Sequence, residues 1–313
     1  MNRTFDPVSL RLFIAVCEEG NIARAAAREA LVASAVSKRM ALLEAELGMP
    51  LLLRGRRGIE PTPAGQTLLR QAREMLNLMA RVHAELSAFT QGVVGNVRIV
   101  ASVSALALGL PRDVAGFLEA HPRLHVSLTE RVGKDVVREV REGTADLGVV
   151  WDAVGTGDLP VLPYRGDRLG LLMPLNHPLA ARRSVSFAQA LPYPAVSVTP
   201  GGLLDDLVRR QAGLLGAAWT PRMEVASFEA AEHIVAAGLG VAIVPIGATG
   251  DAAGTLVCKP LKDAWARRQL VILSRSEPWL SAPARAVRQH LAEVAQTLMR
   301  APPSPSSRGP SGR

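Results

Sequence analysis

The chain has 313 residues, of which 48% are hydrophobic and 20% charged, and it carries a formal net charge of +8 at pH 7. This length allows more than one domain, each with its own core, and the positive charge favours a polyanionic partner. Its two cysteines, Cys17 and Cys258, lie far apart in the sequence, which excludes a disulfide framework and a cysteine-based metal site.

Membrane and secretory classes are excluded as well. The apolar runs are too short or too interrupted to span a bilayer. Residues 1–7 lack the apolar core of a secretion signal. We therefore expect a cytoplasmic protein that has no membrane partner.

Two short helices joined by a tight turn are predicted over residues 22–48. Asn21, which follows a helix break at Gly20, can cap an alanine-rich helix over residues 22–30, and residues 31–33 form the turn. The second helix ends at Gly48, and its apolar face consists of Val36, Met40, Leu43 and Leu47. This arrangement is a helix-turn-helix, in which the second helix enters the major groove of DNA.

The opposite face of the second helix favours contact with DNA. It is small, hydroxylated and basic, because it carries Ser34, Ser37, Lys38, Ala41 and Ala45. An ordinary surface helix would show more alternation of Glu and Lys. We therefore predict contacts with DNA from Ser34, Ser37, Lys38 and Arg39.

A basic hairpin follows over residues 51–65. Two short extended runs flank a glycine-rich turn, where Arg54, Arg56 and Arg57 cluster. We interpret the hairpin as a wing whose arginines meet phosphates or a narrow minor groove. Any one of these arginines alone could be a solvated loop charge. The clustering of these arginines supports DNA binding better than the net charge does, because residues 1–94 hold only 12 Lys and Arg against 9 Asp and Glu.

These segments resemble the LysR-type transcriptional regulators. The similarity runs without a gap from Leu10 to Gly65, and it rests on residues 10–16 (LRLFIAV), Ala25-Ala26, Ala35-Val36-Ser37, Leu43-Glu44, Leu47-Gly48, Pro50-Leu51, Arg54, Arg57 and residues 62–65 (TPAG). Ala33 stands where many members have glutamine, and Leu52 stands where phenylalanine is usual. The resemblance implies a winged helix-turn-helix over residues 1–62, with the DNA sequence preference left open.

A long helix is predicted from the Thr62-Pro63 cap to about Phe89, as the linker of residues 63–92. Its apolar stripe consists of Leu68, Ala72, Met75, Leu76, Met79, Val82, Leu86 and Phe89. The stripe could pack on the chain's own effector domain, or pair with the same helix of a second subunit. We favour a homodimer, because two-fold DNA sites require a two-fold protein, and the family resemblance implies a homotetramer. Residues 91–95 form a hinge.

The remainder alternates strands with helices, which predicts an α/β domain with a mostly parallel sheet. Strands are expected over residues 97–102, 124–130, 146–151, 169–173, 195–198, 222–226, 241–244 and 269–274. Helices are expected over residues 105–120, 135–142, 203–212, 228–238 and 282–299. The resemblance implies two Rossmann-like lobes, similar to periplasmic binding proteins, within residues 95–300. Lobe I would hold residues 95–164 and 267–300, lobe II would hold residues 165–266, and residues 301–313 form a disordered tail.

Hydroxyl groups at strand ends indicate an effector site between the lobes. Ligands of open α/β sheets bind at the carboxyl ends of strands, where Ser102, Ser104, Ser197, Thr199 and Ser227 precede helices. Such residues are also ordinary helix N-caps. Trp151 ends another strand and could line the site or belong to the core. No arginine clamp is evident at these strand ends, so the charge of the ligand stays open, with a small polar or carboxylate-bearing effector expected.

Other classes of function find less support in the sequence. The chain has no Gly-x-Ser-x-Gly elbow, no Walker loop and no His-Glu-x-x-His motif, so we expect neither an enzyme nor a bound cofactor or metal. A DNA-organising protein that needs no effector remains the alternative. We therefore predict a transcription factor that binds double-stranded DNA and is switched by a small molecule.

Overall fold

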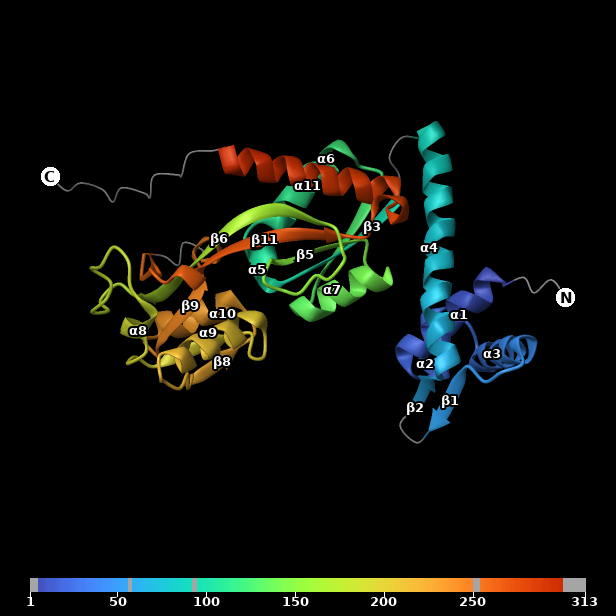
Figure 1. Cartoon of the computed structure of the whole chain (residues 1–313), viewed down its shortest axis with the longest axis horizontal. Helices are drawn as coiled ribbons and strands as arrows, with labels where there is room; N and C mark the ends of the chain where they lie inside the picture. The colour runs from blue at the N-terminus through green and yellow to red at the C-terminus, as the bar shows by residue number, and fades with distance from the viewer. Residues whose placement is uncertain (1–4, 56–57, 92–94, 250–253, 301–313) are drawn as a thin grey trace. The chain divides into compact units, whose positions relative to one another are not determined.

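The computed structural model describes residues 5–55, 58–91, 95–249 and 254–300, and the chain divides into two compact units (Figure 1). The first unit is Met1–Gly92 with Glu142–Thr144, and the second is Val93–Arg141 with Ala145–Arg313. Among the described helices, none is both long and apolar enough to cross a membrane.

The first unit consists of four helices and a hairpin. The helices are α1 (Pro7–Glu19), α2 (Ile22–Arg28), α3 (Ala33–Leu47) and α4 (Pro63–Gln91). The hairpin consists of β1 (Leu52–Gly55) and β2 (Gly58–Pro61), which pair antiparallel. The short helices of residues 22–48 are therefore confirmed, although α2 ends at Arg28 rather than at residue 30 and α3 begins at Ala33, the last residue of the predicted turn.

Local capping explains where these helices begin and end. The side chain of Asn21 accepts hydrogen bonds from the backbone N–H groups of Ala23 and Arg24, at 2.8 and 3.1 Å. Gly48 ends α3 with a φ of 70°, a left-handed conformation that glycine adopts at little cost. The Thr62 hydroxyl accepts a hydrogen bond of 2.9 Å from the N–H of Gly65 at the start of α4. All three caps agree with the sequence prediction.

One apolar core holds the first unit together. Phe13 and Val16 of α1 are fully buried, and they pack with α2, the apolar face of α3 and the start of α4. Val36, Met40 and Leu43 are all buried, whereas Leu47 is only partly buried. Burial of the predicted apolar face leaves the opposite face of α3 at the surface.

The apolar stripe of α4 has two parts. Leu68 and Ala72 are buried in the core of the first unit, and Leu76 packs against it. Further along, an exposed α4 face consists of side chains that are 38% to 62% exposed, namely Met75, Leu78, Met79, Val82 and Leu86. The side chain of Phe89 lies outside the described residues, as do residues 92–94 of the predicted hinge.

The second unit is built on a nine-stranded sheet with the order β4-β3-β5-β11-β6-β9-β7-β8, and β10 pairs with β6. In chain order the strands are β3 (Gly95–Ala101), β4 (Leu124–Glu130), β5 (Leu147–Trp151), β6 (Val161–Pro174), β7 (Ala195–Val198), β8 (Met223–Val225), β9 (Val241–Pro245), β10 (Leu256–Pro260) and β11 (Arg267–Ser274). We call β3, β4 and β5 with their helices the first lobe, and β7 to β10 with theirs the second lobe.

The sheet is parallel only within the lobes. β3 runs parallel to β4 and β5, and β7 runs parallel to β8 and β9. The two central strands, β6 and β11, are antiparallel to each other and to their neighbours. The prediction of a mostly parallel sheet is corrected in this centre, because these two strands connect the lobes in opposite directions.

Seven helices are described in this unit, together with three short 3-10 turns. The helices are α5 (Val103–Ala107), α6 (Leu110–Ala120), α7 (Gly133–Glu142), α8 (Phe187–Ala190), α9 (Leu203–Leu214), α10 (Phe228–Ala236) and α11 (Ala282–Arg300). The single helix predicted over residues 105–120 is wrong, because Gly109, with a φ of 109°, interrupts it. The turns are Ile246–Ala248, Ala264–Ala266 and Glu277–Trp279.

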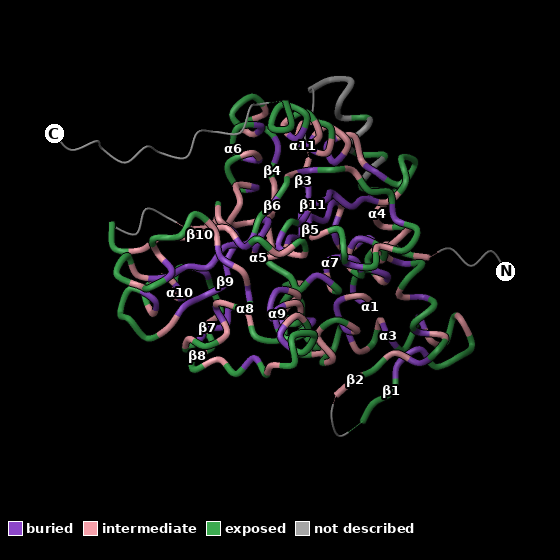
Figure 2. The backbone as a smooth tube through the Cα atoms, turned by 60° about the vertical axis from the view of Figure 1, so that its left-hand side comes forward, coloured by how far each residue is buried: buried purple, intermediate pink, exposed green. Residues whose placement is uncertain are grey.

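Each lobe has its own apolar core. In the first lobe, α6 and α11 cover one face of the sheet and α7 covers the other, and Figure 1 shows α11 lying beside α6. The second lobe packs Phe187, Val196, Val235 and Ile243 into a separate core. Figure 2 shows long buried stretches along β5, β9 and β11. The final strand and helix of the described chain, β11 and α11, thus belong with the first-lobe core.

Candidate DNA-binding surface and effector cavity

The predicted DNA-binding face of α3 lies at the surface. Ser34 and Lys38 are exposed, Ser37 is half-buried, and the neighbouring alanines Ala41 and Ala45 add no bulk. Because Val36, Met40 and Leu43 anchor the other side of the helix in the core, this face can approach a groove without disturbing the fold. The sequence therefore located a usable surface, and its contacts with DNA stay a prediction.

Arg39 has a structural partner that the sequence pattern did not reveal. Its Nη1 lies 2.5 Å from Oδ2 of Asp6, and the same carboxylate caps α1 through the N–H groups of Val8 and Ser9. Hydrogen bonding from the Ser9 hydroxyl, together with these amides and Arg39, holds the pKa of Asp6 below its usual value. Arg39 thus ties α3 to the start of α1.

The wing is attached to α3 through a carboxylate. Oε1 of Glu44 accepts hydrogen bonds from the backbone N–H groups of Leu51 and Leu52, at 2.7 and 3.0 Å. Arg54 is exposed on β1, as a phosphate contact requires. Arg56 and Arg57 lie outside the described residues. Glu44 is therefore a positioning residue, and its place in the Leu43-Glu44 motif was the only sequence signal for it.

A small cavity of about 60 Å³ lies between the two lobes of the second unit. We call it the inter-lobe cavity. It lies at the ends of β3, β4 and β5 and at the start of α9, and it brings together four of the predicted effector residues, namely Ser102, Ser104, Trp151 and Thr199. The other lining residues are Val103, Glu130, Arg131, Val132, Gly133, Gly202, Leu203, Leu204 and Arg268.

The two serines of the first lobe present hydroxyls to this cavity. Ser102 occupies the N-cap position of α5, yet its side chain makes no capping hydrogen bond. Its Oγ is buried without a hydrogen-bond partner in the described structure. The Oγ of Ser104 is 3.4 Å from Nη2 of Arg268. An unsatisfied buried hydroxyl costs about 1–3 kcal/mol, which a ligand that hydrogen-bonds to Ser102 would recover.

Thr199 has an unusual backbone conformation. Its φ is 52°, in the left-handed region that a β-branched residue rarely adopts. Its hydroxyl donates a 2.7 Å hydrogen bond to the carbonyl of Val198, and its N–H donates to the carbonyl of Val225. Such conformations occur disproportionately at binding sites. The strained loop places Thr199 at the entrance to α9, on the second-lobe side of the cavity.

Ser197 and Ser227 do not line the inter-lobe cavity. The hydroxyl of Ser197 is buried and donates a 2.6 Å hydrogen bond to Oδ1 of Asp205. Burial raises the pKa of Asp205, but hydrogen bonds from Arg209, Ser197 and the Gly201 amide hold it below its usual value. Ser227 caps α10 by accepting a 3.2 Å hydrogen bond from the N–H of Ala230. Both hydroxyls therefore have local structural roles, which was the alternative interpretation of the sequence.

Arg268 is the cavity residue that the sequence analysis missed. It lies on β11, its side chain is only 2% exposed, and it forms an ion pair with Asp167 of β6. Its guanidinium group also lies over the ring of Trp151, with the guanidinium carbon 5.5 Å from the ring centre. Burial lowers the pKa of Arg268, against the opposing effect of Asp167, and burial raises the pKa of Asp167. An antiparallel strand begins at the edge where its parallel neighbours end, so an arginine at the start of β11 reaches the cavity.

Gly133 lets the two lobes approach each other beside this cavity. A Cβ atom at this position would lie 2.4 Å from Cδ1 of Leu203, the first residue of α9. A side chain at residue 133 would therefore require the end of the Leu203 side chain to shift. The start of α7 thus lies in close contact with the first residue of α9.

Comparisons with known protein families agree with this architecture. Residues 8–66 match the family described as the bacterial regulatory helix-turn-helix protein, lysR family. Residues 90–296 match the LysR substrate binding domain. Together the two matches cover α1 to α3 and the wing of the first unit, from residue 8, and nearly all of the described second unit, whereas most of α4 lies between them.

Individual relatives extend over most of the chain. The transcriptional regulator YnfL of Escherichia coli K12 is 30% identical over 244 residues, covering 75% of this chain and 80% of the relative. A probable hydrogen peroxide-inducible genes activator of Mycobacterium avium is 28% identical, covering 78% of this chain and 79% of the relative.

Solved structures share the fold. Full-length OxyR from Pseudomonas aeruginosa superposes with a TM-score of 0.71 at 21% identity, covering 94% of this chain and 96% of that one. CbnR, a LysR family transcriptional regulator, superposes with a TM-score of 0.65 at 23% identity, covering 93% and 99%. With two family domains that follow one another along the sequence, the chain belongs to the LysR family of helix-turn-helix transcriptional regulators.

Proposed function

We propose that this regulator binds double-stranded DNA through α3 and the wing, and that a small molecule in the inter-lobe cavity controls the geometry of the bound protein. The observation that carries the proposal is the buried hydroxyl of Ser102, which has no partner among the described residues and lies in a cavity between two separately packed lobes. The DNA contacts we propose come from Ser34, Ser37, Lys38, Arg39, Arg54, Arg56 and Arg57.

The chemistry of the cavity favours a small polar effector that carries a carboxylate. Ser102 and Ser104 offer hydroxyl donors, and Arg268 offers a buried guanidinium. A volume of about 60 Å³ holds only about two waters, so a metabolite requires the lobes to separate. A ligand that contacts both lobes would bind one lobe arrangement more tightly than the other, and only this difference in affinity can shift the equilibrium.

We further propose that the protein is a homodimer that assembles into a tetramer. The exposed α4 face offers a row of apolar side chains at helical spacing, which suits pairing with the same helix of a second copy. Two-fold pairing places two α3 helices on half-sites about 10 base pairs apart. The domains would be residues 1–62 for DNA, 63–92 for dimerisation and 95–300 for the effector, and the site of action would be the cytoplasm.

A DNA-binding experiment separates this proposal from a DNA-organising protein without an effector. Selection from a random duplex pool should enrich paired half-sites, and a library of small carboxylates should then change the footprint on the enriched sequence. A chain that enriches no sequence would support the alternative. We also expect that the protein catalyses no reaction on the effector, so that the compound is recovered unchanged after incubation.

The inter-lobe site has its own test, in which Ser102→Ala is combined with Thr199→Ala. Thermal-shift screening would first identify a carboxylate that binds the parent protein. The double variant should bind this carboxylate about tenfold more weakly, because each hydrogen bond contributes about 0.5–1.5 kcal/mol. Basal DNA affinity should stay within a factor of two. The matched control is Ser227→Ala, whose hydroxyl caps α10 outside the cavity. Calorimetry measures the effector affinity, and equal affinities of the double variant and the parent would place the site elsewhere.

A further inference from the structure

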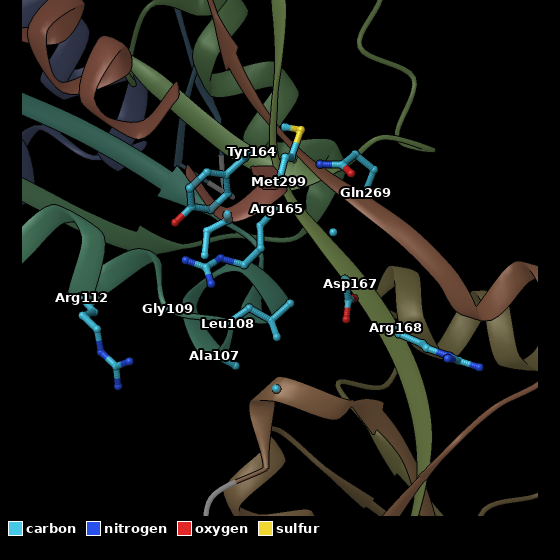
Figure 3. Close-up of a pocket in the computed structure, with 13 residues that line it drawn as sticks. Ala107, Leu108, Gly109, Arg112, Tyr164, Arg165, Asp167, Arg168, Gln269 and Met299 are labelled. Atoms are coloured by element: carbon cyan, nitrogen blue, oxygen red, sulfur yellow. The ribbon is translucent and has the colours of Figure 1, made fainter. Parts of the chain in front are cut away.

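A second and much larger cavity lies in the same unit. It has a volume of about 620 Å³ and lies where the α5–α6 junction, β6, β11 and the end of α11 come together (Figure 3). We call it the β6 cavity, and its lining residues include Leu108, Arg112, Tyr164, Arg165, Asp167 and Met299. None of the hydroxyls of the inter-lobe site lines it, so it is a separate feature of the molecule.

The charge around the β6 cavity is positive. Arg165 forms a 2.8 Å ion pair with Asp113, and Asp167 is paired with Arg268, so these charges balance. Among the described residues, Arg168 donates only to the carbonyl of Leu261, and Arg112 is exposed and has no partner. Two uncompensated guanidinium groups therefore remain on the lining, which favours an anion.

Two buried polar atoms at the β6 cavity, one donor and one acceptor, are available for hydrogen bonds with a ligand. Nε of Arg165 is a donor without a partner in the described structure, and Oδ1 of Asp167 is an acceptor without one. The side chain of Asp167 is only 1% exposed, so water outside the cavity does not satisfy it. Figure 3 shows Tyr164 and Arg165 on one side of the cavity and Asp167 on the other. A ligand could accept a hydrogen bond on the first side and donate one on the second.

Apart from Gln269 and three glycines, the rest of the lining is apolar. Leu108 comes from the end of α5, and Leu298 and Met299 are 41% and 60% exposed at the end of α11. Concave sites with apolar walls and a few polar groups are the usual form of small-molecule pockets, and 620 Å³ lies within their ordinary range of about 300–1,000 Å³. The combination suits an organic anion with an apolar body and one hydrogen-bond donor.

We propose that the β6 cavity is a second ligand site, which takes an organic anion with an apolar body. The site does not depend on the function proposed for the inter-lobe cavity. Asp167 lines the β6 cavity and its partner Arg268 lines the inter-lobe cavity, so the buried ion pair forms a wall shared by both. β6 and β11, which carry this pair, are also the strands that connect the lobes.

The probe for this site is 8-anilinonaphthalene-1-sulfonate, which combines a sulfonate, an apolar ring system and an N–H donor. Its matched control is N-phenyl-1-naphthylamine, which has the same rings without the sulfonate. With the full-length protein, the sulfonate should bind saturably and at least tenfold more tightly than the neutral compound. Equal binding of both compounds would overturn the anion site and leave an apolar surface only.

Two variants localise the binding. Arg112→Gln and Leu298→Glu change exposed side chains, so the fold is kept, and each should weaken sulfonate binding about fivefold. The matched control is Arg210→Gln, an exposed arginine on α9 that does not line the cavity. Parental affinity in both cavity variants would overturn the proposal. Parental affinity in Ser102→Ala is expected, because that residue belongs to the other cavity.

A local signal completes the test. In protein labelled with ¹³C at the methionine methyl groups, Met299→Leu identifies the Met299 signal. That signal should shift during the titration, with the same midpoint as the fluorescence, because Met299 lines the cavity. A stationary Met299 signal at saturating probe would overturn the site, whatever happens at the other methionines.

Discussion

The DNA-binding face of α3 and the inter-lobe cavity differ in how their polar groups are satisfied. Ser34 and Lys38 are exposed, so water satisfies their polar groups in the absence of DNA. Ser102 and Arg268 are held away from water, and the hydroxyl of Ser102 has no partner in the described structure. The first surface is ready for its ligand at no cost to the fold. The inter-lobe cavity holds an unsatisfied hydroxyl, and a ligand that hydrogen-bonds to it would remove this unfavourable contribution to the free energy. A switch requires such a difference in ligand affinity between two conformations.

The largest expected effect tests the buried side of this comparison. Arg268→Met should destabilise the second unit by about 3–5 kcal/mol, because it leaves the Asp167 carboxylate buried without its partner. Chemical denaturation followed by tryptophan fluorescence measures this change. The matched control is Arg268→Met combined with Asp167→Leu, which removes both charges and should recover most of the loss. A single variant as stable as the parent would show that the ion pair is not buried as described.

The exposed α4 face tests the proposed pairing with a second copy of the chain. Met75→Glu with Met79→Glu should raise the dimer dissociation constant at least about 100-fold, because it places charge in an apolar seam. The control is Ala80→Glu, an exposed α4 position outside the stripe. Sedimentation velocity should show smaller species only for the first variant. Intact assembly with a retained fold would place the interface elsewhere, and effector binding should be unchanged either way.

These two regions also differ in how far the sequence predicted them. The α3 face lies within a single helix, so a period of 3.6 residues separated Val36 and Met40 from Lys38 without knowledge of the fold. The cavity joins side chains from residues 102 to 268, and only the topology brings them together. Ser197 and Ser227 carried the same signal as Ser102, a hydroxyl between a strand and a helix, yet their hydrogen bonds are local.

The connecting strands explain the remaining differences. Only residues 169–173 of β6 were predicted, because Arg165, Asp167 and Arg168 make the first half of the strand polar. In the structure this half pairs with β11, and Asp167 is directly opposite Arg268 in the register. An ion pair between residues 101 positions apart leaves no periodic signal in the sequence. The location of the inter-lobe cavity was therefore predicted from the sequence, but its buried arginine was not.

A smaller effect is expected at the DNA surface. Lys38→Gln should weaken DNA binding about tenfold and reduce the slope of log affinity against log salt by about one, as the loss of one phosphate contact requires. The control is Lys134→Gln, an exposed lysine of the second unit. Gel shifts at several salt concentrations give both values. A change in affinity with an unchanged slope would assign Lys38 to base edges rather than to phosphates.

An effect that is absent at neutral pH compares the two units through their thiols. Cys17 lies in the first unit and Cys258 in the second, and burial raises the pKa of each thiol to about 12 from an ordinary value of 9.0. A raised pKa favours the neutral thiol in the folded state. Its contribution to stability is therefore complete below about pH 9 and is lost progressively between about pH 9 and pH 12. Alanine at either position should flatten the fall of stability over this range.

The same thiols report which unit opens first. At pH 8 a thiol-specific reagent such as 5,5′-dithiobis(2-nitrobenzoate) should react with the native protein more slowly than with the unfolded chain by at least about 100-fold, since only the thiolate attacks. Single variants Cys17→Ala and Cys258→Ala assign the two rates. An effector for the inter-lobe cavity should slow the reaction of Cys258, whose unit it stabilises, and leave that of Cys17 unchanged. Equal slowing of both would mean that the two units do not open independently.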